Sequence, residues 1–219
     1  MLIDEVEWLG HSGFRVSVGR QRVYIDPYRV SPDAPKADLI LLTHGHYDHF
    51  SPQDVELLST PDTEVIAPAA VAERLSGRVK SIAPGEEIEP DKVRWVAVRA
   101  VHAYNTSKRN SDGQVFHPRP AGGVGYDLNV RGERLYHAGD TDVIPEMDSV
   151  HGVDVALLPV SGTYVMTASE AAEAARRIQP RTAVPMHWGS HLGTRDDAMA
   201  FSRQAPSEVE VVIMEKAVV

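Results

Sequence analysis

The sequence predicts an α/β protein built as an αββα sandwich, in which two mixed β-sheets pack face to face and helices cover their outer faces. Two observations indicate this fold class. Each half of the chain starts with short alternating strands and continues with strand–helix pairs, and no low-complexity linker separates the halves. The length of 219 residues suffices for one sizeable core, so we predict a single domain over residues 1–219.

The first half opens with alternating apolar residues, which predict three short antiparallel strands, at 6–9, 14–18 and 23–25. The continuous apolar run at 38–42 predicts a strand buried on both faces. Ser51 is a favourable helix N-cap and Pro52 suits the first helical position, so we expect a helix over 52–58. A strand and a helix are expected next, at 63–67 and 69–75.

The second half repeats this arrangement, with strands expected at 93–101, 123–130, 133–137 and 154–160. A longer helix is predicted over 169–178, with Thr167 as its cap, Glu170 in its first turn and Pro180 after its end. A strand, a helix and a strand follow, at 182–186, 195–203 and 208–214. The segment 103–122 has no periodicity of its own, and a loop of this length is usually functional or mobile.

Composition restricts the classes of partner. The formal net charge is −9, which disfavours a nucleic-acid partner because the molecule as a whole repels phosphate backbones. There are no cysteines, so every metal ligand must be nitrogen or oxygen. The N-terminus lacks the basic and apolar regions of a signal peptide, and no apolar run is long enough to span a bilayer, so we expect a cytoplasmic protein without a membrane span. Homo-oligomerisation stays open.

The stretch 44–49 directly follows the predicted buried strand and contains three histidines and one aspartate: His44, His46, Asp48 and His49. Imidazole nitrogens and carboxylates are ligands that zinc, iron and manganese share. Three further residues, His102, Asp140 and His187, also follow predicted strands. We therefore expect them to complete a dinuclear metal site at the strand ends.

The order of these residues resembles the ligand series of the metallo-β-lactamase superfamily, and five stretches are similar to its L-ascorbate-6-phosphate lactonase-like branch: 8–14, 24–27, 123–126, 136–142 and 184–187. The resemblance implies the metallo-β-lactamase fold and two divalent ions, Zn²⁺ before Mn²⁺ or Fe²⁺. The implied ligands are His44, His46 and His102 for the first ion, Asp48, His49 and His187 for the second, and Asp140 as a bridge.

We therefore expect a metal-dependent hydrolase in which hydroxide bound by both ions cleaves a small ester, lactone or phosphoester. Asp48 and His11 are the candidate catalytic residues, His11 as a proton donor at the rim of the site or merely as a polar turn residue. Two alternatives stay open for the whole chain. One is a phosphodiesterase or nuclease, and the other is a metal-binding protein without turnover.

Further residues are candidates around the metals. Asp26 ends a strand and is placed to accept the free N–H of a ligating histidine, or simply to cap the turn at Pro27. The substrate is expected to be a small molecule and can be anionic, with five candidate contacts: Tyr104, Arg109, His117, Arg119 and His191. The alternatives are a solvated loop for the first four and a surface turn for His191.

Overall fold

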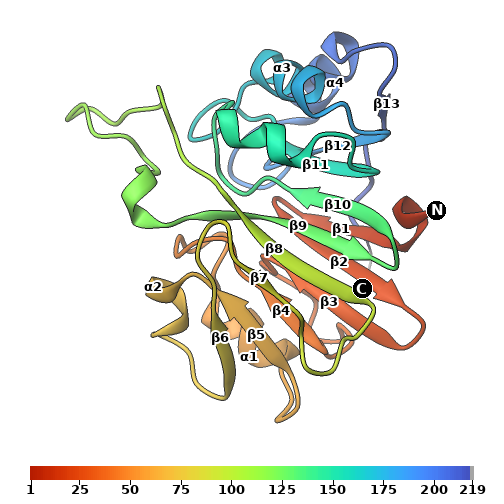
Figure 1. Ribbon diagram of the computed structural model, residues 1–219. Helices are drawn as coiled ribbons and strands as arrows, with labels where there is room; N and C mark the ends of the chain where they lie inside the picture. The colour runs from red at the N-terminus through yellow and green to blue at the C-terminus, as the bar shows by residue number, and fades with distance from the viewer. Residues whose placement is uncertain (218–219) are drawn as a thin grey trace.

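Two β-sheets face each other across a shared hydrophobic core in the computed structural model, which describes residues 1–217. Helices α1 and α2 lie on one side of the sandwich, and α3 and α4 lie on the opposite side (Figure 1). This arrangement confirms the predicted αββα sandwich. No helix within these residues has the length and apolar character needed to cross a bilayer.

The first sheet contains six strands in chain order: β1 (Val6–Gly10), β2 (Gly13–Val18), β3 (Gln21–Ile25), β4 (Leu39–Leu41), β5 (Glu64–Ala67) and β6 (Arg78–Ser81). β1 to β3 pair antiparallel, and β3 to β6 pair parallel. Its outer face packs on α1 (Pro52–Leu58) and α2 (Ala69–Ala72). Helix α1 begins as predicted, because the Ser51 side chain accepts the N–H of Asp54. Helix α2 is shorter than predicted, and β6 was not predicted because its residues are half-exposed or exposed and show no apolar alternation.

The second sheet has the spatial order β13-β12-β11-β10-β9-β8-β7. Its strands are β7 (Glu87–Ile88), β8 (Val96–His102), β9 (Val124–Val130), β10 (Glu133–His137), β11 (Val155–Pro159), β12 (Thr182–Met186) and β13 (Glu210–Val211). β7 to β10 pair antiparallel and β10 to β13 pair parallel. β13 is shorter than the predicted 208–214 because the chain then crosses to the first sheet, where the Ala217 N–H donates to the Trp8 carbonyl at 2.8 Å.

Helices α3 (Ala168–Ile178) and α4 (Arg195–Gln204) cover the second sheet, and three 3₁₀ helices complete the structure: η1 (Leu2–Glu5), η2 (Arg119–Ala121) and η3 (Pro145–Val150). Helix α3 begins with a reciprocal capping box. The Glu170 N–H donates to the Thr167 hydroxyl at 3.2 Å, and the Glu170 carboxylate accepts the Thr167 N–H at 2.8 Å. This confirms the predicted cap and fixes the start of the helix.

The carboxyl ends of β4 and β10, one from each sheet, meet at the same end of the sandwich. The Val124 N–H donates to the Thr43 carbonyl at 3.0 Å, and the Tyr126 hydroxyl donates to the Leu42 carbonyl at 2.7 Å. Both bonds run from β9 to the loop that follows β4. The histidine-rich loop is therefore fastened to the second sheet as well as the first.

Candidate metal centre

The loops at this end of the sandwich bring together three overlapping groups of nitrogen and oxygen donors. Within each group the donor atoms lie within 4.8 Å of one another. The groups are His44, His46 and His117; His44, His49 and Asp140; and His11, Asp48, His49 and His187. Because His44 and His49 each belong to two groups, the donors form one continuous cluster.

In the first half of the cluster, the ring nitrogens face each other at short range. His46 Nδ1 lies 3.0 Å from His44 Nε2 and 3.1 Å from His117 Nε2. His117 Nε2 lies 3.4 Å from Asp140 Oδ2. Donors on one tetrahedral Zn²⁺, with bonds of about 2.0–2.1 Å, are about 3.3 Å apart. The spacing of these four donors therefore fits one ion among them.

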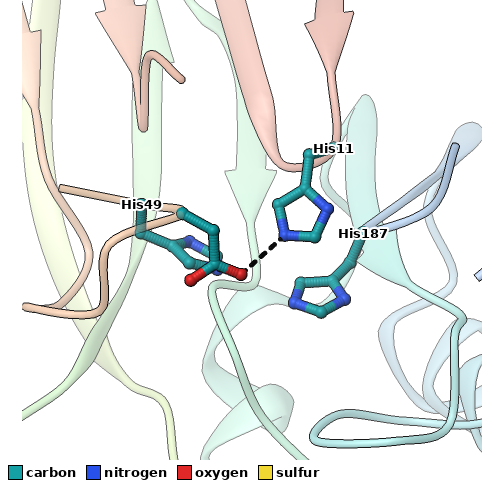
Figure 2. Close-up of side chains that lie close together, drawn as sticks. His11, His49 and His187 are labelled. Atoms are coloured by element: carbon teal, nitrogen blue, oxygen red, sulfur yellow. Dashed lines mark hydrogen bonds and ion pairs between the residues drawn. The ribbon is translucent and has the colours of Figure 1, made fainter. Parts of the chain in front are cut away.

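The second half of the cluster contains buried polar atoms that lack a hydrogen-bond partner. Asp140 Oδ1 lies 3.1 Å from His49 Nε2, and Asp140 Oδ2 lies 3.3 Å from His187 Nε2. Among residues 1–217, Asp140 Oδ1 and the two Nε2 atoms make no hydrogen bond although all three are buried. Figure 2 shows His49, His187 and His11 directed toward a common region. Unpaired buried polar atoms are costly, and a cation between these atoms would satisfy all three.

His11 lies inside the cluster rather than at its rim, where we had expected it. Its side chain is 1% exposed, and its Nε2 lies 3.0 Å from Asp48 Oδ2. Burial lowers the pKa of His11 to about 4, against the opposing effect of the Asp48 hydrogen bond. Burial would raise the pKa of Asp48, but the His11 hydrogen bond and the His49 charge lower it. A neutral imidazole and a carboxylate are therefore the stable forms of this pair.

The backbone at the cluster is strained. His11, Asp26 and His187 have φ values of +54°, +43° and +60°, in the left-handed region that residues other than glycine rarely adopt. Such conformations cost about 1–3 kcal/mol each. The His11 carbonyl accepts the His187 N–H at 2.8 Å and the Trp8 indole N–H at 2.9 Å, which ties two of the strained residues together. Through this carbonyl, the backbone positions of the His11 and His187 imidazoles are coupled.

The ring nitrogens that face away from the cluster have partners of their own. His49 Nδ1 lies 2.7 Å from Asp26 Oδ2, and Asp26 also accepts from the hydroxyl and N–H of Thr43, at 2.6 and 2.8 Å. Ser161 Oγ lies 2.9 Å from His187 Nδ1. The Asp26 carboxylate can only accept, so the His49 Nδ1 carries the proton and its Nε2 faces the cluster, while the Ser161 hydroxyl orients the ring of His187. Sequence reasoning pointed to Asp26 but gave no signal for Ser161.

Asp26→Asn should weaken metal binding at the His49 side about 10- to 100-fold, because the amide does not orient the imidazole as the carboxylate does. The matched control is Asp54→Asn. Asp54 is also buried, and its carboxylate accepts the N–H groups of Arg29 and Val30 at 2.9 and 3.0 Å, away from the cluster. Competition with a chromophoric chelator measures the metal affinity of both variants. Equal affinity in Asp26→Asn and in the control would contradict the assigned role.

The structure brings His117, not His102, to the cluster. His102 ends β8, is half-buried, and lies 3.4 Å from an Arg119 nitrogen instead of facing another histidine. The chain then leaves the site and returns at His117, whose Nδ1 bonds to Asn105 Oδ1 at 2.8 Å. Asn105 is in turn held by Asp142 Oδ1 at 3.1 Å. The sequence analysis gave His117 only a substrate-binding role, and it did not identify Asn105 and Asp142 as the residues that support His117.

The other predicted substrate residues of the segment 103–122 lie outside the cluster. Arg119 pairs with Glu146 at 2.7 Å, and the Tyr104 hydroxyl bonds to the same carboxylate at 3.1 Å. The exposed Arg109 donates to the Gly113 carbonyl at 2.7 Å, in the part of the segment that projects from the body of the molecule (Figure 1). The sequence pointed to an anion-binding loop because of its positive charges. In the structure, Arg119 pairs with a carboxylate and Arg109 donates to a backbone carbonyl of the same segment.

Asp140 is presented by a tight turn after β10. Gly139 has φ +65°, and a Cβ there would lie 2.6 Å from the Val124 carbonyl oxygen, so only glycine fits. The buried His137 supports the turn, since its Nδ1 accepts the Gly139 N–H at 3.2 Å while its Nε2 bonds to the Ser12 carbonyl at 2.9 Å. His137 therefore has a structural role.

Two cavities, of about 240 and 320 Å³, reach the cluster from different sides. They share four lining residues: His46, Phe116, His117 and Asp140. The larger cavity is also lined by Tyr47, Asp48 and His191. His191 Nε2 lies 2.9 Å from the Tyr47 hydroxyl and 3.5 Å from Asp48 Oδ2, so this histidine, predicted as a substrate contact, lies over the donors.

Comparisons with known proteins show which family the chain resembles. Residues 5–187 match a family model described as a beta-lactamase superfamily domain. The chain is 33% identical to a UPF0173 metal-dependent hydrolase of Methanopyrus kandleri and 32% identical to one of Thermococcus onnurineus, each over 96% of both proteins. A solved structure from Parabacteroides distasonis, named for metal-dependent hydrolysis, aligns with a TM-score of 0.83 and 32% identity over 96% of this chain and 92% of its own.

Proposed function

This chain belongs to the beta-lactamase superfamily and to the UPF0173 metal-dependent hydrolases, and on that premise we propose that it is a hydrolase with a two-metal centre. The observation that carries the proposal is the convergence of buried, partly unpaired donor atoms from both sheets. The proposed ligands are His44, His46 and His117 for one ion and Asp48, His49 and His187 for the other, with Asp140 between them.

Two divalent ions held there would supply Lewis acidity for a carbonyl or phosphorus centre and would lower the pKa of a water molecule toward about 7. The protein's own contribution is positional. Asp140 directs Oδ1 to one half of the cluster, and its Oδ2 lies near histidines of both halves. The buried His11 hydrogen-bonds to Asp48 and thereby positions its carboxylate. His191 and Tyr47 are placed to orient a substrate in the larger cavity.

The cavities support a small substrate. The volume of about 320 Å³ lies at the lower end of ordinary ligand pockets and that of about 240 Å³ lies just below it, so each suits a compact molecule. We therefore propose a small ester, lactone or phosphoester as the substrate class. Zn²⁺ is the proposed metal because the spacing around His46 fits its tetrahedral geometry.

Metal removal tests the proposal. Protein dialysed against a strong chelator should lose hydrolysis of a panel of small esters, lactones and phosphoesters, and two equivalents of Zn²⁺ per chain should restore it. Rebinding should also raise the unfolding temperature, because the ions bind only the folded cluster. Elemental analysis gives the stoichiometry. Activity that survives full metal removal, or no turnover of any panel member with two ions bound, would overturn the proposal.

A further inference from the structure

The cavity beside His44, His46 and His117 has an uneven lining. Most of its wall away from the donors is apolar and includes Pro68, Ala70, Val71, Phe116, Pro118 and Ala121. One arginine, Arg74, also lines it. Within the described chain, neither this cavity nor the larger one is lined by any other arginine or by a lysine. Arg74 is therefore the only fixed positive charge that lines either cavity.

Arg74 is held in place without being neutralised. It follows α2, and its guanidinium lies 4.6 Å from the centre of the Phe50 ring. One nitrogen donates a long hydrogen bond, 3.4 Å, to the Gly45 carbonyl between His44 and His46. Arg74 has no carboxylate partner among residues 1–217, whereas Arg119 pairs with Glu146. A guanidinium carries five N–H donors, so most of those of Arg74 are free.

Other cations near the cluster are less well placed. Arg29, Arg195 and Lys216 line a third cavity, on the far side of His11. His11 is the only cluster residue in that lining, and it is 1% exposed. The Arg74 cavity instead includes four donors of the cluster: His44, His46, His117 and Asp140. A molecule in the Arg74 cavity therefore reaches the donors and the cation at once.

We infer that Arg74 determines the substrate specificity of this site by binding a carboxylate or phosphate group of the substrate. A planar guanidinium fork matches both anions, and the exposed Arg74 is accessible to either at the mouth of the cavity. The substrate is then a compact ester, lactone or phosphoester with a short apolar body and a second, anionic group. The part of this inference that concerns cleavage of the substrate at the metal centre rests on the proposed function. Anion binding by Arg74 does not depend on it.

Direct binding tests the anion site without turnover. Titration calorimetry of the metal-loaded protein with inorganic phosphate and with butyrate separates the two anions. Arg74→Gln should weaken binding of the preferred anion about tenfold or more, because a charge-assisted hydrogen bond is lost. The matched controls Arg109→Gln and Arg29→Gln should stay within about twofold of the native protein. Unchanged binding in Arg74→Gln, or a loss confined to Arg29→Gln, would overturn the inference.

Kinetics separates substrate recognition from support of the metal loop. With monomethyl glutarate and methyl butyrate as an anionic and neutral pair, Arg74→Gln should lower the ratio of their kcat/KM values about tenfold, mainly through KM. Arg74→Lys should recover part of that ratio. Equal losses on both esters together with a lower metal content would mean that Arg74 only braces Gly45, which overturns the inference. If the native protein with two ions bound cleaves no ester, lactone or phosphoester of the panel but Arg74→Gln still loses anion binding, the proposed function fails and the anion site stands.

Discussion

Replacing Asp140 by alanine should lower kcat/KM by about three orders of magnitude or more, while the fold remains intact. Asp140 is 4% exposed, and its two oxygens lie within 3.4 Å of ring nitrogens of His49, His117 and His187. No other carboxylate among the described residues reaches both halves of the cluster. The variant removes negative charge from between two proposed cations, so their mutual repulsion should also lower the metal content.

Three measurements separate this effect from misfolding. Circular dichroism reports the sheets, elemental analysis reports the metal, and the ester and lactone panel reports turnover. Asp140→Asn, which keeps the shape of the side chain, should behave like the alanine variant because the charge is what is lost. Asp91→Ala is the control, since Asp91 is a surface carboxylate paired with Arg78 and Lys80. An Asp140→Ala protein with two ions per chain and a native rate would exclude the bridging role.

The second large effect is expected from a comparison that tests whether His117 or His102 is a metal ligand. His117→Ala should reduce activity by about two orders of magnitude or more and should release one of the two ions, since loss of a donor costs several kcal/mol of metal stabilisation. His102→Ala should stay within a few-fold of the native rate and retain both ions, because His102 contacts Arg119 rather than the cluster. The pair is matched because His102 directly precedes the segment 103–122 and His117 lies within it.

The metal content of the two variants decides whether His117 or His102 is the ligand, even if no substrate is found. Full occupancy in His117→Ala with loss of an ion in His102→Ala would restore the ligand set that the sequence resemblance implied. Asn105→Ala gives an independent check. Asn105 contacts the Nδ1 of His117, so its loss should weaken metal binding in the same direction but by a smaller factor, about 10- to 100-fold.

The sequence was sufficient for elements whose boundaries depend on local chemistry. Ser51 and Thr167 were predicted as helix caps, and both side chains accept the expected N–H. The buried strands β4 and β12 were also placed within about a residue. The strand β6 could not be predicted in this way, because its pairing with β5 is a long-range property of residues that are largely solvent-facing.

The same limit applies to the candidate site. Donors that closely follow strands, such as Asp140 and His187, could be placed because the strand fixes where the chain emerges. His117 lies within a long irregular segment, and spacing alone does not show where such a segment turns back. Arg74 was missed for a related reason. It lies after α2 in a polar stretch, and only the packing of that helix against β5 and β6 brings it beside Gly45.

The fastening of the histidine-rich loop to the second sheet has a consequence for biosynthesis. The donors of the cluster extend from residue 11 to residue 187, and the loop after β4 is held by β9, which is synthesised much later. A nascent chain that ends with β8 contains His44, His46, Asp48 and His49 but lacks the donors His117 and Asp140 and the strand β9 that fastens their loop. High-affinity binding of the proposed ions should therefore require the completed chain, and the ions would stabilise the folded protein rather than direct its folding.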